Sequence, residues 1–127
     1  MKGKQRFFIC ETCKNFLSLL EDKGGPMTCC GKPLTELAPN TVDASAEKHV
    51  PAVTKIENGI RVEVGSVLHP MTQEHLITFI YVETEKGGQR KSLKAGDDPI
   101  AEFIFTNDAP IAVYEYCNLH GLWKAEV

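Results

Sequence analysis

Residues 53–64 read Val53-Thr54-Lys55-Ile56-Glu57-Asn58-Gly59-Ile60-Arg61-Val62-Glu63-Val64. Two alternating segments, Val53–Ile56 and Ile60–Val64, flank the dipeptide Asn58-Gly59. Asn-Gly between such segments is the strongest short-range signal for a hairpin, because both residues tolerate positive φ. The stretch therefore predicts a β-hairpin.

Similar short segments continue from this hairpin to the C-terminal end. Turn clusters at residues 86–88, 95–99 and 107–110 separate them, and no uninterrupted helical window of a dozen residues occurs. Short strands at this spacing are typical of an antiparallel β-sandwich, so we expect an all-β fold. The predicted strands are His75–Thr84, Arg90–Leu93, Ile100–Thr106, Ile111–Cys117 and Leu122–Glu126.

The segment before the hairpin has a different character. Residues 38–46 contain a proline and little hydrophobic periodicity, which indicates a connection between two domains. Before them we expect two short strands, Arg6–Ile9 and Phe16–Leu20. Fewer than forty residues bury too little apolar area to fold unaided, so a metal or a partner subunit is expected to hold them together. The predicted domains are 1–37 and 38–127.

Composition narrows the class of protein. Of the 127 residues 43% are hydrophobic and 24% charged, as in a globular protein. The net charge of -3 and the scattered basic residues argue against a nucleic-acid partner. The apolar run Phe7–Cys10 is too short for a signal peptide or a membrane span, so we expect a cytoplasmic protein with no membrane partner. Five cysteines in that reducing compartment indicate metal or redox chemistry.

Four cysteines near the N-terminus form the first candidate metal site. Cys10 and Cys13 have the Cys-x-x-Cys spacing that lets both sulfurs reach one ion, and Cys29-Cys30 completes a set of four. Four thiolates suit zinc or a mononuclear iron, and the ligand count does not separate the two. Adjacent residues of an extended strand point to opposite faces, so the backbone at Cys29-Cys30 must bend and the tetrahedron should be distorted.

The remaining cysteine and all four histidines form the second candidate site. One thiolate and four imidazoles exceed what a zinc site uses, and on an octahedral ion five ligands leave one position free. This donor set favours iron, with copper a weaker choice. Each histidine alone is more often a surface or hydrogen-bonded residue. Two sites nevertheless account for every cysteine and histidine, and the second consists of His49, His69, His75, Cys117 and His120.

Two charged residues precede the first of these histidines. A ferrous ion with one thiolate and neutral imidazoles has a charge of 2 - 1 = +1, so its free position favours a small anion. Lys48 would add to that attraction, and Glu47 is placed to compete for the same position. The alternative is that both are solvated surface charges.

Taken in order, these motifs resemble the desulfoferrodoxins, the two-iron form of superoxide reductase. The similarity covers essentially the whole chain through the first four cysteines, Glu47–Pro51, His69-Pro70, His75 and Cys117–Gly121. It implies a desulforedoxin-like N-terminal domain with iron bound by Cys10, Cys13, Cys29 and Cys30. It also implies an immunoglobulin-like domain with iron bound equatorially by His49, His69, His75 and His120 and axially by Cys117.

The resemblance also implies a function and partners. It implies that the protein reduces superoxide by one electron to hydrogen peroxide. It also implies that Lys48 assists the binding and protonation of superoxide and that Glu47 occupies the sixth position of the iron in the oxidised resting state. A homodimer and a rubredoxin-like electron donor are expected. The sequence departs from the family at Lys14, where glycine is usual, and at Phe79, where many members have tryptophan. The alternatives are a non-catalytic iron electron-transfer protein and a zinc-stapled binding module.

Overall fold

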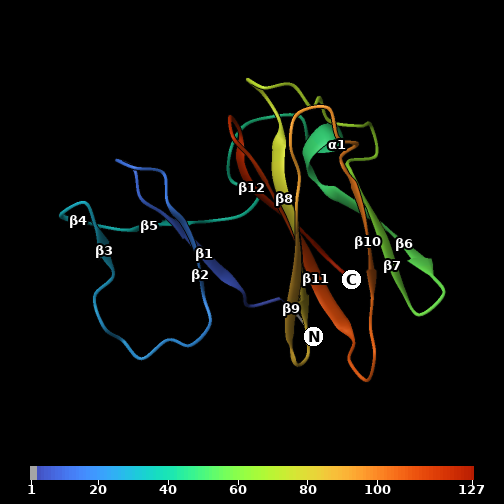
Figure 1. Ribbon diagram of the computed structural model, residues 1–127, viewed down its shortest axis with the longest axis horizontal. Coiled ribbons are helices and arrows are strands. Elements are labelled where there is room, and N and C mark those ends of the chain that lie inside the picture. The colour runs from blue at the N-terminus through green and yellow to red at the C-terminus, as the bar shows by residue number, and fades with distance from the viewer. Residues whose placement is uncertain (1–2) are drawn as a thin grey trace. The chain divides into compact units, whose positions relative to one another are not determined.

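The computed structural model describes residues 3–127, which divide into two compact units (Figure 1). We call residues 4–38 the cysteine unit, and residues 39–127 together with Gly3 the sandwich unit. Strands form most of the regular structure of both units, and the one α-helix of the described residues is four residues long. None of the helical structure in residues 3–127 has the length and apolarity needed to cross a bilayer. The prediction of an all-β fold is confirmed.

The cysteine unit is built on one central strand. β1 (Arg6–Ile9) pairs antiparallel with β2 (Phe16–Leu19) on one side and with β5 (Thr35–Leu37) on the other. The two-residue strands β3 (Thr28–Cys29) and β4 (Lys32–Pro33) form a separate ladder. The sequence predicted β1 and β2, whereas β3, β4 and β5 are too short to show a hydrophobic period.

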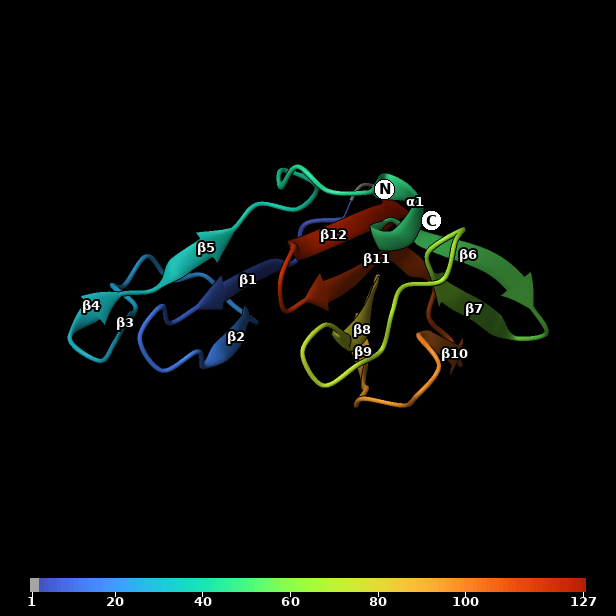
Figure 2. The ribbon, with the colours of Figure 1, turned by 90° about the horizontal axis from the view of Figure 1, so that it is seen from above.

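The sandwich unit consists of seven strands in two antiparallel sheets, which face each other in Figure 2. One sheet has the order β10-β7-β6 and the other the order β12-β11-β8-β9. Three and four antiparallel strands are the sheet sizes of an immunoglobulin-like sandwich. The strands are β6 (Pro51–Ile56), β7 (Gly59–Val64), β8 (Ile77–Thr84), β9 (Gly87–Ser92), β10 (Ile100–Ile104), β11 (Pro110–Cys117) and β12 (Gly121–Glu126).

The predicted hairpin forms as the sequence requires. β6 and β7 pair from Ile56 opposite Gly59 to Pro51 opposite Val64, and Asn58 has a φ of 61°. Side chains of β7 alternate in burial, with Ile60, Val62 and Val64 all buried in the core between the two sheets. The alternation therefore directs one face of this hairpin strand onto β8 and β11, where Ile80 and Val113 also belong to the core.

Two features differ from the sequence prediction. The short helix α1 (Ala46–His49) begins at the end of the expected connection, residues 38–46, and the sequence did not predict it. A helix of one turn is too short to produce a periodic hydrophobic pattern. The turn after β8 is also shorter than the predicted cluster at residues 86–88, because Gly87 and Gly88 already pair with β8. A Cβ on Gly88 would collide with the Tyr81 hydroxyl, so any larger residue at this strand position would displace the Tyr81 side chain.

Asn40, near the start of the segment 39–127, makes a set of hydrogen bonds to β12. The Asn40 amide side chain bonds both the backbone nitrogen and the carbonyl of Lys124, at 2.8 and 3.1 Å, and its backbone nitrogen bonds the carbonyl of Leu122. The Lys124 side chain reaches the carbonyl of Gly3 at 2.9 Å. Gly3 and Asn40, which are far apart in the sequence, thus both form hydrogen bonds with β12.

We expect Asn40→Ala to lower the free energy of unfolding of the sandwich unit by about 2 kcal/mol, because it removes two hydrogen bonds and places alanine at a φ of 62°. Asn40→Gly is the matched control, since it removes the same bonds but accepts this φ. Urea unfolding followed by Trp123 fluorescence measures both. Equal stability of the alanine variant and the wild type would contradict this role.

Candidate metal centres

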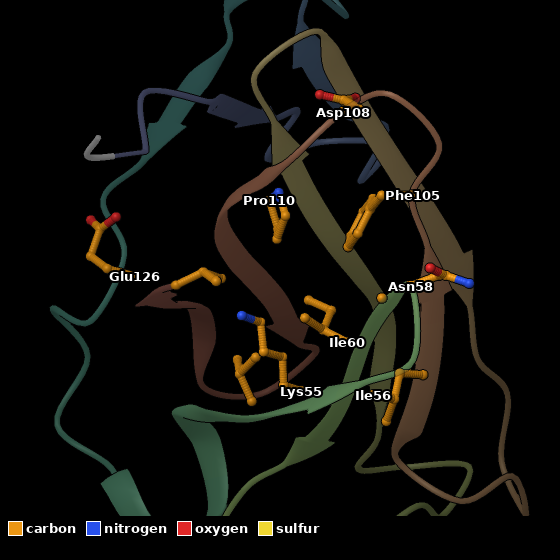
Figure 3. Close-up of a pocket in the computed structure, with 11 residues that line it drawn as sticks. Lys55, Ile56, Asn58, Ile60, Phe105, Asp108, Pro110 and Glu126 are labelled. Carbon is orange, nitrogen blue, oxygen red and sulfur yellow. The ribbon is translucent and has the colours of Figure 1, made fainter.

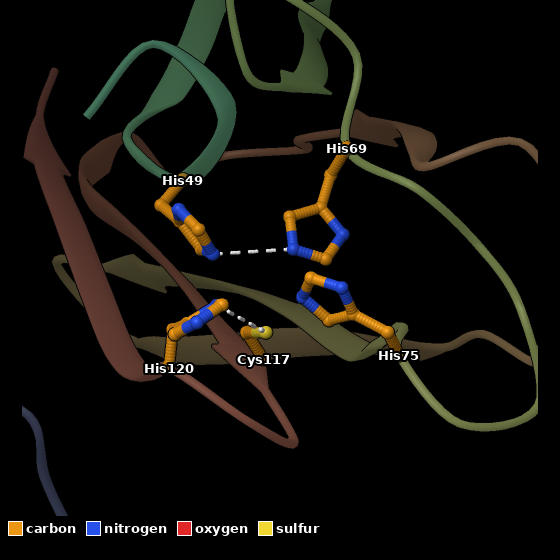
Figure 4. A group of neighbouring side chains, drawn as sticks. All are labelled: His49, His69, His75, Cys117 and His120. Carbon is orange, nitrogen blue, oxygen red and sulfur yellow. Dashed lines mark hydrogen bonds between the residues drawn. The ribbon is translucent and has the colours of Figure 1, made fainter. Parts of the chain in front are cut away.

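The second candidate site lies at one end of the sandwich unit, where five side chains from different elements meet (Figure 4). Their donor atoms all lie within 4.8 Å of one another. His49 ends α1, His69 and His75 lie in the segment between β7 and β8, Cys117 ends β11, and His120 lies in the turn before β12. The structure therefore brings together all five residues that the sequence singled out.

Backbone carbonyls hold two of the rings with one nitrogen turned outward. His49 Nδ1 lies 2.6 Å from the carbonyl oxygen of Ser45, and His69 Nδ1 lies 2.6 Å from that of Pro70. A carbonyl accepts only from an N–H, so both neutral rings carry their proton on Nδ1 and present an unprotonated Nε2 to the site. A metal-binding histidine is usually oriented in this way.

The inward nitrogens fit a bound cation. His49 Nε2 and His69 Nε2 lie 3.2 Å apart, so two lone pairs face each other with no proton between them in these tautomers (Figure 4). His75 Nε2 is buried and has no hydrogen-bond partner in the described part of the chain. A buried polar atom without a partner is costly, and a metal ion would satisfy all three nitrogens.

Burial sets the protonation preference of these ligands. Burial lowers the pKa of His69 to about 4 and also lowers the pKa values of His49 and His75. Neutral imidazole is the form that binds a metal, so the rings are ready as ligands at neutral pH. Burial raises the pKa of the Cys117 thiol, and a coordinated metal ion is the usual means of deprotonating such a thiol.

Residues outside the ligand set fix the turn that carries Cys117 and His120. The Asn118 side chain accepts from the Leu76 amide at 3.0 Å and donates to the Glu74 carbonyl at 2.9 Å, which ties this turn to the segment of His75. Trp123 donates from its indole nitrogen to the His120 carbonyl and stacks on His49, with ring centroids 5.0 Å apart. The motif Cys117–Gly121 contains Asn118, but the sequence does not show the two hydrogen bonds that its side chain makes.

Glu47 and Lys48 lie on α1 and are both exposed. Among the described residues, the group of potential ligands that contains the four histidines and Cys117 does not include Glu47. The Glu47 carbonyl accepts from the Val67 amide at 3.0 Å, which fixes the helix beside the segment that leads to His69. The Lys48 charge contributes, after burial and the charge of His120, to the lowered pKa of His75. The charge of Lys48 therefore favours the neutral form of the His75 ring.

The first candidate site gathers the four cysteines of the cysteine unit. Their sulfurs lie within 4.8 Å of one another, and Cys13 Sγ lies 3.5 Å from Cys29 Sγ. Cys30 has a φ of 53°, so the backbone leaves the extended conformation between the adjacent cysteines as their side chains require. A hydrogen bond from the Cys13 backbone amide lowers the pKa of Cys10 to about 6. The arrangement suits one ion bound by four thiolates.

Lys14 lies in the left-handed backbone region that favours glycine. Its φ is 67°, and its amide donates to the Cys10 carbonyl at 2.8 Å, which closes the turn. We expect Lys14→Gly to stabilise the cysteine unit by up to about 1 kcal/mol, because glycine adopts this φ without steric cost. Lys32→Gly in β4 is the control and should destabilise. Resistance of the iron-loaded cysteine unit to urea measures both, and a destabilising Lys14→Gly would contradict the account.

The comparison with known proteins agrees with these two donor sets. The sequence model of desulfoferrodoxin matches residues 41–126. This chain belongs to the desulfoferrodoxin family. A desulfoferrodoxin from Syntrophotalea carbinolica is 45% identical over 126 residues, with 99% of each chain covered. A second desulfoferrodoxin, from Nitratidesulfovibrio vulgaris, is 43% identical over 126 residues, again with 99% of each chain covered.

A solved structure extends the likeness to three dimensions. The crystal structure of the superoxide reductase from Treponema pallidum matches with a TM-score of 0.81 and 35% identity, and covers 98% of this chain and 100% of that one. Family membership, the four-cysteine group and the group of four histidines and one cysteine are together consistent with two iron sites. The resemblance inferred from the sequence is confirmed.

Proposed function

We propose that this desulfoferrodoxin is a superoxide reductase, which converts superoxide to hydrogen peroxide by one-electron reduction. The observation that carries the proposal is the group of five donors, His49, His69, His75, Cys117 and His120, with every donor atom within 4.8 Å of the others. Five donors leave an octahedral ion one position for a small molecule. A protein that only relays electrons gains nothing from such a position.

Iron, when bound, supplies one electron to superoxide, which takes up two protons and becomes hydrogen peroxide. The chain orients the ligands for this reaction through the carbonyls of Ser45 and Pro70, which hold the rings of His49 and His69. Trp123 covers one ring face and excludes water from that side. Cys117 provides the single soft, anionic donor, and its burial protects the sulfur from solvent.

We assign Lys48 to attraction of the superoxide anion and Glu47 to competition for the open position in the oxidised protein. Both residues belong to α1, directly before His49. The influence of Lys48 on the pKa of His75 supports an electrostatic role, because it places a positive charge close enough to affect the site. The exposure of both side chains leaves Lys48 accessible to an arriving anion and leaves Glu47 space to turn towards the open position.

The reaction is tested by the yield of hydrogen peroxide. Full-length protein loaded with iron and reduced is mixed with superoxide generated by pulse radiolysis. A reductase forms as much hydrogen peroxide as the superoxide consumed and releases no oxygen, whereas a dismutase forms half as much and releases oxygen. A colourless protein that contains zinc and leaves superoxide unchanged would favour a zinc-stapled binding module instead.

For Lys48→Ile we expect the bimolecular rate constant with superoxide to fall about tenfold and to depend less on salt, since a nearby cation steers an anion. Pulse radiolysis at several ionic strengths measures both effects. Lys48→Arg retains the charge and should retain most of the rate. An isoleucine variant with the wild-type rate would remove Lys48 from the reaction.

The cysteine unit suggests where electrons enter. Cys13 and Cys30 are exposed, so a rubredoxin-like donor protein can approach the sulfurs of the first iron. We propose that domain 1–37 is a desulforedoxin-like iron domain and that domain 38–127 performs the reaction. A cytoplasmic homodimer is the proposed state, in line with five free cysteines. Sedimentation equilibrium and stopped-flow reduction by a purified rubredoxin test the dimer and the donor.

A further inference from the structure

We propose that Asn118 determines which metal the second site accepts, because it holds His75 in place as the fifth donor. Asn118 is a positioning residue: its side chain bonds the backbone on either side of His75, and it directly follows Cys117, another donor. The inference rests on the proposed function, since it takes iron as the metal that the reaction needs. It adds the class of metal that the site must reject, which is a four-coordinate ion such as zinc.

Nitrogen and sulfur donors do not select ferrous iron by affinity alone. Zinc binds a given set of such donors more tightly than ferrous iron does, so selection must come from the number and geometry of the ligands. A structural zinc site uses four protein ligands, whereas the second site offers five. Release of His75 would leave a set of four nitrogen and sulfur donors, His49, His69, Cys117 and His120. The place of His75 therefore decides whether the site suits zinc.

The other four donors have anchors of their own. Backbone carbonyls hold the rings of His49 and His69 at Nδ1. The indole of Trp123 donates to the carbonyl of His120 at 3.0 Å. Cys117 is the last residue of β11 and pairs with both β12 and β8. None of these anchors involves the turn at residues 72–75, so loss of that turn would leave four donors in place.

The fifth donor ends a turn whose other residues, 72–74, are exposed. Thr72 closes this turn with His75: the Thr72 amide donates to the His75 carbonyl at 2.9 Å, and the Thr72 hydroxyl accepts from the His75 amide at 3.1 Å. These bonds shape the turn but do not attach it to the turn of Cys117. Nε2 of the His75 ring is buried and has no hydrogen-bond partner within residues 3–127. The position of this ring therefore depends on how the turn is attached.

Asn118 supplies that attachment. Its side-chain oxygen accepts from the Leu76 amide at 3.0 Å, and its side-chain nitrogen donates to the Glu74 carbonyl at 2.9 Å. Its backbone amide donates to the Leu76 carbonyl at 3.2 Å. The side-chain bonds bracket His75, since Glu74 and Leu76 are its neighbours in the sequence. Both bonds need an amide, because asparagine offers a separate donor and acceptor on a side chain of this length.

Competition between metals tests the proposal. Full-length protein, with the first iron ferric and the second ferrous, is brought to equilibrium with zinc, and metal analysis gives the ratio of zinc to iron. The visible absorption of the first iron shows how much of the exchange occurs at the four thiolates. X-ray absorption at the zinc edge separates a site with one sulfur from a site with four. Asn118→Ala should raise the zinc-to-iron ratio at the second site at least about tenfold, as expected when a contact outside the ligand set is lost.

Asn118→Asp gives an intermediate variant. Its carboxylate still accepts from the Leu76 amide but cannot donate to the Glu74 carbonyl, so the zinc-to-iron ratio should rise less than in Asn118→Ala. Circular dichroism verifies the fold of both variants, and the aspartate variant decides the matter if the alanine variant does not fold. A wild-type ratio in the folded variants would overturn the proposal.

His75→Ala separates positioning from a general loss of stability. If Asn118 acts through His75, Asn118→Ala adds nothing to the ratio in a His75→Ala background, and an equal effect in both backgrounds would refute this role. Asn58→Gly is the matched control and should keep the wild-type ratio. Asn58 lines a cavity of about 550 Å³ that shares no residue with either metal site, and glycine accepts its φ of 61° (Figure 3). The ratio is measured without superoxide, so it tests Asn118 even if the proposed reaction fails.

Discussion

A Cys117→Ser variant is expected to lose more than about 100-fold of its rate with superoxide, since even changes outside a ligand set cost metal sites 10- to 100-fold. Cys117 is completely buried and is the single sulfur donor of its group. A serine hydroxyl stays protonated at neutral pH, so the donor set loses both its softness and its negative charge. Pulse radiolysis of the reduced variant measures the rate, and metal analysis measures the iron retained.

The first iron site provides the control for this variant. Cys10, Cys13, Cys29 and Cys30 belong to the other compact unit, so the visible absorption of an iron bound to four thiolates should persist in Cys117→Ser. Asn118→Asp tests the neighbouring turn without changing a ligand, and should retain iron at both sites. Near-wild-type reduction of superoxide by Cys117→Ser would contradict the assignment of the thiolate as a ligand.

Loss of metal from the first site should unfold the cysteine unit and leave the sandwich unit folded. The buried apolar residues among positions 4–38 are four consecutive ones, Phe7, Phe8, Ile9 and Cys10. The ion pairs of Arg6 with Asp22 and Glu36 join half-exposed side chains, and such pairs contribute about 1 kcal/mol or less. Binding of a structural metal by four thiolates contributes on the order of 10 kcal/mol, which exceeds both effects.

Cys13→Ser tests this dependence directly. We expect the amides of β1 and β2 to exchange with solvent at least about 100-fold faster in this variant, while the amides of β8 and β11 keep their protection. Hydrogen exchange with mass spectrometry resolves the two units. Thr12→Ser, which alters the same turn without removing a sulfur, is the matched control. Protected β1 amides in metal-free Cys13→Ser would show that the unit folds without its ion.

The strands of the sandwich could be predicted because their signals are local. Alternation around Asn58-Gly59 determined the hairpin, and the turn clusters marked the limits of β8, β10 and β11 to within a few residues. The strands β3, β4 and β5 have two or three residues, which is too short for a period. The helix α1 could not be predicted either, because its four residues form a single turn, which is too short to show a helical period. The side chain of Ser45, the residue before it, makes no capping hydrogen bond.

The ligand sets were predictable for a different reason. Cysteine and histidine are rare in this chain, and two metal sites accounted for all nine of them. The sequence could not show how the rings are held, because the carbonyls of Ser45 and Pro70 and the side chain of Asn118 act through the folded backbone. The bend between Cys29 and Cys30 was predictable, since neighbouring side chains share a metal only if the strand turns.

The hydrogen bonds of Lys124 bring together the two points at which the chain enters and leaves the cysteine unit. Lys124 bonds to Gly3, which precedes that unit in the sequence, and to Asn40, which follows it. Joining Gly3 to Asn40 by a short linker would delete residues 4–39 while leaving the hydrogen bonds of Gly3 and Asn40 to β12 in place. A form of this chain with the sandwich unit alone therefore requires a single splice, at two residues that bond the same strand.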